Sequence, residues 1–96
     1  MLKIKTGVRP RSFVILAAAA NAALFMGIEV TITAGTDGKH MTGSKHYTGE
    51  AVDIRTSSFA SPQELDAFVM HLEGRLPTGY HVIRERDHLH VEFDPA

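Results

Sequence analysis

Residues 80–93 read Tyr-His-Val-Ile-Arg-Glu-Arg-Asp-His-Leu-His-Val-Glu-Phe and contain two strand-like segments, 80–84 and 88–93, on either side of a charged turn. β-Branched and aromatic residues favour strands, and two such segments joined by a short polar turn predict an antiparallel hairpin. In the second segment apolar and polar residues alternate, so the two sets are expected on opposite faces of the strand. The polar set consists of His88, His90 and Glu92.

Two segments outside this hairpin predict helices. Residues 12–26 are rich in Ala and Leu, which favour helix, and they precede Gly27, a residue type at which helices commonly end. Residues 61–64 read Ser-Pro-Gln-Glu. This pattern predicts a helix start in which Ser61 is the N-cap and Glu64 completes a capping box.

Residues 28–33 and 51–55 predict two more strands, because both are rich in β-branched residues. The segment between them, residues 34–49, is composed mostly of Gly, Thr, Ser, Lys and His, as loops are. A loop this long in a small domain commonly carries function. Two helices against a small antiparallel sheet predict a single α+β domain over residues 1–96.

Charge and cysteine content exclude several classes of protein. Ten basic and eleven acidic residues nearly cancel, so the basic surface typical of a nucleic-acid-binding protein is not expected. There are no cysteines, so any metal ion must be held by imidazole and carboxylate groups. A domain this small has a thin core, to which a bound metal would add stability.

The N-terminal segment fits two interpretations. The apolar stretch 13–20 follows four basic residues, as in a secretory signal, and Ala-Asn-Ala at 20–22 would be its cleavage site. The same stretch fits a helix of the mature domain, because it continues to Phe25 and leads almost directly into a strand. It is too short and too rich in alanine for a membrane span, so no stable membrane insertion is expected.

Asp53 is an unusual residue for the middle of a strand, where aspartate is disfavoured. By the two-residue period of a strand, it shares a face with Ala51 and Arg55. A carboxylate that is partly removed from water needs a cation or hydrogen-bond donors. A metal ion would satisfy Asp53, and so would Arg55 or another basic side chain.

His88 and His90 are expected to point the same way from their strand. They are candidate metal ligands, since neutral imidazole binds zinc. The alternative is a hydrated polar face, which is common where one side of an antiparallel sheet meets water.

Two longer motifs join these candidates. Residues 44–53 match Ser-x-His-x-x-Gly-x-Ala-x-Asp, and residues 87–90 match Asp-x-x-His with a nested His-x-His. With both motifs, the chain resembles a family of zinc peptidases that includes bacterial D-Ala-D-Ala carboxypeptidases and phage L-alanoyl-D-glutamate endopeptidases. The fold of that family is shared with the hedgehog signalling domain. The resemblance extends from about residue 28 to residue 93.

The resemblance implies a role for each matched residue. His46, Asp53 and His90 would be the zinc ligands, with the fourth position left for water. Asp87 would be the general base that activates the attacking water, and His88 would support a ligand or stabilise the developing oxyanion. Strand alternation alone does not choose between His88 and His90 as ligand; the resemblance makes that choice.

A carboxypeptidase also needs a cation that binds the terminal carboxylate of the substrate. Family members generally place an arginine upstream of the first histidine, but residues 33–40 contain none. Lys39 or His40 would have to substitute, although lysine lacks the two-pronged geometry of arginine. Ser44 is a further candidate for substrate contact. Carboxypeptidase and endopeptidase activity therefore both remain open.

The leading hypothesis is a zinc peptidase that cuts the stem peptides of bacterial peptidoglycan. It would be made in the cytoplasm and act on the cell wall as a phage lysis or virion-associated enzyme, or it would be secreted through an N-terminal signal. The second hypothesis is a zinc-stabilised binding or structural module of the same fold that has no catalytic activity. Asp87 distinguishes the two, because only catalysis needs the base.

Overall fold

The computed structural model describes residues 2–4, 10–34 and 51–94 of the 96-residue chain. Its elements are β1 (Leu2–Ile4), α1 (Pro10–Met26), β2 (Val30–Ala34), β3 (Ala51–Arg55), α3 (Pro62–Glu73), β4 (Tyr80–Arg84) and β5 (His88–Phe93). In the part of the chain that is described, neither helix is both long enough and apolar enough to cross a membrane.

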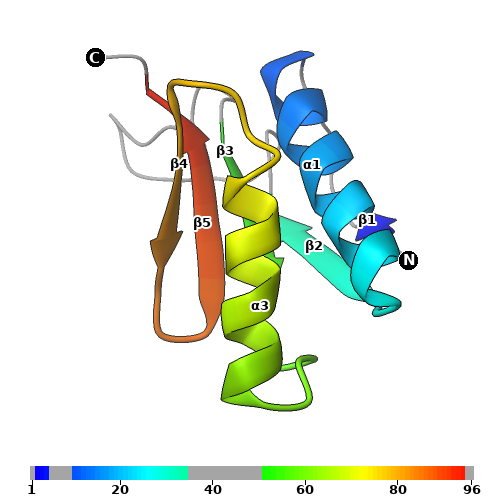
Figure 1. Cartoon of the computed structure of the whole chain (residues 1–96). Coiled ribbons are helices and arrows are strands. Elements are labelled where there is room, and N and C mark those ends of the chain that lie inside the picture. The colour runs from blue at the N-terminus through cyan, green and yellow to red at the C-terminus, as the bar shows by residue number, and fades with distance from the viewer. Residues whose placement is uncertain (1, 5–9, 35–50, 95–96) are drawn as a thin grey trace.

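The strands form one sheet in the order β1-β2-β3-β5-β4 (Figure 1). β2 pairs with β3, β3 with β5 and β5 with β4, all antiparallel. The predicted class, α+β with an antiparallel sheet and two helices, is confirmed at this level. β1, a three-residue strand that pairs parallel to β2 at the edge of the sheet, was not predicted from the sequence. Three residues are too few for a periodic pattern to be recognised.

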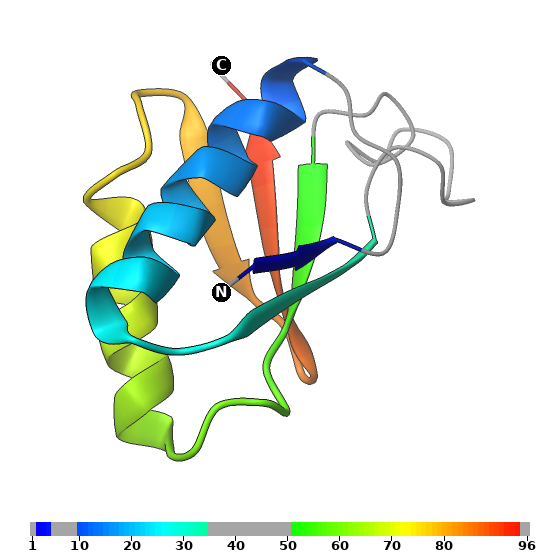
Figure 2. The same cartoon turned by 90° about the vertical axis from the view of Figure 1, so that its right-hand side faces the viewer.

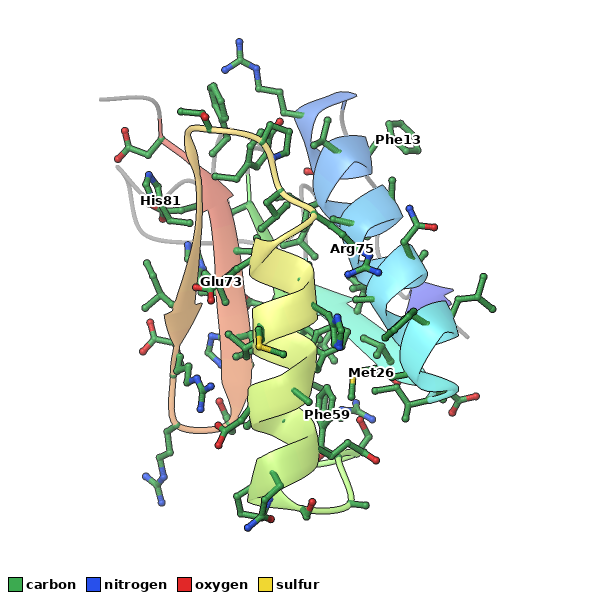
Figure 3. The ribbon with its side chains drawn as sticks, viewed as in Figure 1. Phe13, Met26, Phe59, Glu73, Arg75 and His81 are labelled. Atoms are coloured by element: carbon green, nitrogen blue, oxygen red, sulfur yellow. The ribbon has the colours of Figure 1, made fainter. Side chains whose placement is uncertain are left out.

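The two described helices, α1 and α3, lie on one side of the sheet, so the described part of the chain forms two layers (Figure 2). The core lies between the layers, where apolar side chains of the helices meet those of the strands. The fully buried strand residues in it are Val30, Ile32, Val52, Ile54, Leu89 and Val91. Met26 and Phe59 extend the core where α1 ends and α3 approaches (Figure 3).

α1 begins two residues before the predicted start and ends where predicted. Gly27 has a positive φ of 69°, a conformation that glycine adopts without strain. The N–H of Ile28 then donates to the carbonyl oxygen of Ala23 at 3.0 Å, which caps the helix. Because this N–H is used by the cap, β2 begins at Val30 rather than at Ile28.

The start of α3 confirms Ser61 as the N-cap. Its Oγ accepts a hydrogen bond from the N–H of Glu64 at 3.1 Å. The carboxylate of Glu64 accepts from the N–H of Ala60 at 3.0 Å, one residue before the position that a capping box would use. The helix buries Phe68 and Leu72 against the sheet, as its apolar stripe predicts.

The other face of the sheet points away from the helices and carries polar side chains. Since Val52, Ile54, Leu89 and Val91 face the core, the residues that alternate with them in β3 and β5 must lie on this opposite face. The antiparallel register places Asp53 directly opposite His90, and Arg55 opposite His88. The predicted alternation in residues 88–93 is therefore confirmed, and the candidate site lies on this polar face.

Candidate functional site

The centre of the site is a contact between Asp53 in β3 and His90 in β5. Asp53 Oδ1 lies 3.3 Å from His90 Nδ1, and the two side chains are only 16% and 15% exposed. Both residues are on strands with a neighbour on each side, so their backbones are held firmly in the sheet. The strand carboxylate singled out in the sequence thus has an imidazole as a partner.

His90 contacts a second carboxylate through its other ring nitrogen. Its Nε2 lies 2.9 Å from Glu92 Oε1, and the side chain of Glu92 is 17% exposed. A protonated imidazole can donate to both carboxylates at once, whereas a neutral one can donate to only one. The hydrogen bond to Asp53, with a further contribution from Glu92, therefore raises the pKa of His90 above its ordinary value, although burial opposes the shift.

His88 lies between Asp53 and Asp87. Its Nε2 is 3.7 Å from Asp53 Oδ1, and its Nδ1 is 2.7 Å from Asp87 Oδ1. The hydrogen bond donated by His88 holds the pKa of Asp87 below its ordinary value, even though the Asp87 side chain is 85% exposed. Asp87 is thus an ionised carboxylate at neutral pH, and it is positioned to orient the imidazole.

The backbone around Asp87 is fixed by two hydrogen bonds. The N–H of Thr56, just after β3, donates to the carbonyl oxygen of Asp87 at 3.3 Å. The N–H of Glu85 donates to the carbonyl oxygen of His88 at 2.9 Å and closes the turn between β4 and β5. The end of β3 and the start of β5 are thereby held side by side.

A shallow pocket of about 280 Å³ opens on this face. Its lining joins the end of β3, the start of β5 and one residue of β2. The lining residues are Thr33, Asp53, Arg55, Ser57, Asp87 and His88.

The spacing of Asp53 and His90 matches the spacing that two zinc ligands require. Two ligand atoms at the usual zinc distances and a tetrahedral angle lie about 3.3 Å apart. The pair of Asp53 Oδ1 and His90 Nδ1 has this separation, and an oxygen with a nitrogen suits zinc chemically. His88 Nε2 is farther from the carboxylate, at 3.7 Å.

The structure brings together four of the predicted site residues: Asp53, Asp87, His88 and His90. The other four, Lys39, His40, Ser44 and His46, lie outside the described residues, and their roles stay predictions. Within the described residues, no three His, Asp or Glu side chains form a group that could hold a metal ion.

Two residues of this surface, Glu92 and Ser57, were not assigned a role from the sequence, and Arg55 was named only as an alternative partner of Asp53. The strand period already placed Glu92 beside His90 and Arg55 beside Asp53, so the signal for a shared face was present. Nothing in the sequence indicated that the turn after β3 would bring Ser57 to the same pocket, because that depends on how β3 and β5 pair.

The two remaining described histidines make local contacts elsewhere. The ring of His71 in α3 lies 4.7 Å from the ring of Phe25, measured between centroids. His81 in β4 donates through Nε2 to the carbonyl oxygen of Asp94 at 2.9 Å (Figure 3). Each is explained by a structural contact.

Chemically, the surface offers a carboxylate and an imidazole at metal-ligand spacing, with an Asp–His pair next to them that can move a proton. These are the groups that metal-assisted hydrolysis requires. No protein-family model matches the chain, and a search of curated proteins finds no match.

Proposed function

We propose that this protein is a zinc-dependent peptidase that hydrolyses bonds in the stem peptides of bacterial peptidoglycan. The activity would be of the D,D-carboxypeptidase or the L-Ala-D-Glu endopeptidase type, on a fold of the hedgehog and D,D-peptidase kind. One observation carries the proposal. Asp53 Oδ1 lies 3.3 Å from His90 Nδ1 on the polar sheet face, next to the hydrogen-bonded Asp87 and His88.

Asp53 and His90 would hold the zinc ion together with His46. Because Nδ1 of His90 faces Asp53 while Nε2 faces Glu92, Nδ1 is the nitrogen that would bind the metal. Glu92 would accept the proton of Nε2 and keep the ring in the required tautomer. When bound, zinc would polarise the scissile carbonyl and lower the pKa of the attacking water to roughly 7.

Asp87 and His88 would handle the proton. Asp87 accepts a hydrogen bond from Nδ1 of His88, which leaves Nε2 directed toward Asp53. The pair can take a proton on the side of the scissile bond and return it to the leaving amine. His88 transmits the effect of Asp87 in this arrangement, since its ring contacts Asp87 through Nδ1 and faces Asp53 through Nε2.

The proposal is tested by incubating the zinc-loaded protein with purified peptidoglycan and identifying the released termini by mass spectrometry. Asp53→Ala is expected to abolish both zinc binding and hydrolysis. Asp87→Asn keeps the shape of the side chain but removes its charge, so hydrolysis should be lost while zinc affinity is nearly unchanged. Full activity of a chelated, metal-free sample would refute a zinc peptidase.

A zinc-stabilised module without catalytic activity is the second candidate. The observation that favours it is the small pocket, whose volume of about 280 Å³ is at the lower end for sites that enclose a ligand. In that case zinc would raise the melting temperature, no peptide bond would be cut, and Asp87→Asn would have no effect on either property.

A further inference from the structure

Arg55 lines the pocket that also contains Asp53, Asp87 and His88. It shares a strand face with Asp53, two residues away, and it stands opposite His88 in the sheet register. Its side chain is exposed, and within the described part of the chain it forms no ion pair or hydrogen bond. By contrast, Arg84 on the neighbouring hairpin is paired with Asp66 at 2.7 Å.

A cation in this position changes what the pocket can bind. Asp53 and Asp87 would repel an anionic substrate, and among the lining residues that the structure describes Arg55 is the only permanently charged cation. Guanidinium presents a planar fork of donors that matches a carboxylate. The hydroxyl of Ser57, on the turn after β3, lines the same pocket and can donate a further hydrogen bond.

We propose that Arg55, assisted by Ser57, binds a free α-carboxylate on the residue that follows the scissile bond. This inference rests on the proposed peptidase function and specifies its substrate class. Successive residues on one strand face are about 6.5 Å apart, and one extended residue of a bound peptide spans about 3.5 Å. With the scissile carbonyl near Asp53, the next α-carboxylate is therefore within reach of the long Arg55 side chain.

The two kinds of cut in the proposed function share this chemical feature. A D,D-carboxypeptidase releases a C-terminal residue, whose α-carboxylate is free. In an L-Ala-D-Glu bond, D-Glu also has a free α-carboxylate when the chain continues through its side-chain carboxyl. One arginine subsite would therefore suit both, and the enzyme would discriminate against peptides in which this carboxylate is amidated or part of an ordinary peptide bond.

Binding is tested without catalysis by titrating the 15N-labelled protein with N-acetyl-D-alanine and, separately, with its carboxamide. The acid is expected to shift the NMR signal of the Arg55 Nε–H, and the amide is not. Arg55→Ala should weaken binding of the acid about 10- to 100-fold, the usual effect of losing hydrogen bonds to a charged group. Arg55→Lys should bind with intermediate affinity.

Arg84→Ala is the matched control, since it removes an exposed arginine from β4, two strands away from β3 and on the opposite sheet face. It should bind the acid like the unmodified protein. The subsite would be overturned if the acid and the amide caused equal shifts, or if the acid caused none. It would also be overturned if Arg55→Ala bound the acid as tightly as the unmodified protein does. Circular dichroism and zinc affinity of the Arg55 variants check that the fold and the metal site are intact.

Turnover is measured on paired peptides that carry either a carboxylate or a carboxamide after the scissile bond. Arg55→Ala should lower kcat/KM about 10- to 100-fold for the acid and change it within about twofold for the amide. If both peptides were hydrolysed without any preference for the acid, the peptidase function would stand and the Arg55 subsite would be refuted. If the protein bound the acid specifically but hydrolysed neither peptide, the Arg55 subsite would stand and the peptidase function would be refuted.

Discussion

Glu92→Gln tests whether the second carboxylate of His90 supports a metal ligand. The substitution keeps the size of the side chain and an oxygen that can accept from Nε2, but it removes the negative charge 2.9 Å from the ring. Loss of such a partner usually lowers metal affinity 10- to 100-fold. Because the amide still accepts a hydrogen bond, we expect about a 10-fold loss for Glu92→Gln and a larger one for Glu92→Ala.

The effect should depend on pH. Zinc binds the neutral imidazole, so protons compete with it below the pKa of His90, which Asp53 and Glu92 raise. Glu92→Gln lowers that pKa and eases the competition in acid. The 10-fold difference in zinc affinity between the two proteins is therefore expected in full at alkaline pH. It should shrink as the pH falls through the pKa that His90 has in the unmodified protein.

Zinc affinity is measured by competition with a chelator of known affinity over a series of pH values. Glu73→Gln is the control, since Glu73 is exposed on α3 on the other side of the sheet. Equal zinc affinities for the Glu92→Gln and unmodified proteins at alkaline pH would refute the role of Glu92. A difference that is constant at all pH values would refute the link to His90.

Three other predictions concern the ligand choice, the pH dependence of stability and the core. His90→Ala should abolish zinc binding while His88→Ala retains most of it, as chelator competition will show; the reverse result would exchange the ligands. Because the pKa of His90 is raised in the folded state, its contribution to the stability of the metal-free protein is fully present below the unfolded pKa of about 6.5 and is lost as the pH rises through the folded pKa. Urea unfolding of His90→Gln should show a flatter pH profile, and an unchanged profile would contradict the assignment. Phe68→Ala, at a fully buried position, should cost about 3 to 5 kcal/mol in urea unfolding, whereas Met70→Ala, at an exposed position of the same helix, should cost less than about 0.5 kcal/mol.

The sequence predicted those features that depend on neighbours along the chain. Alternation in residues 88–93 placed His88 and His90 on one face because the side-chain period of a strand is two residues. Ser61 and Gly27 marked helix ends because a hydroxyl oxygen and a positive φ act within one turn. The motifs that indicate zinc remain a prediction about residues 44–53 and 87–90.

Only the tertiary structure decided which residues of different strands meet. A shift of one residue between β3 and β5 would move Asp53 away from His90 and turn its side chain toward the core, and no local pattern fixes that register. The pairing is set by burial of Val52 and Ile54 with Leu89 and Val91 under the helices. The same register carries Arg55 and Asp87 into one pocket. The sequence by itself thus determined the kinds of groups and the faces they occupy, while packing of the apolar face against α1 and α3 determined their positions relative to one another.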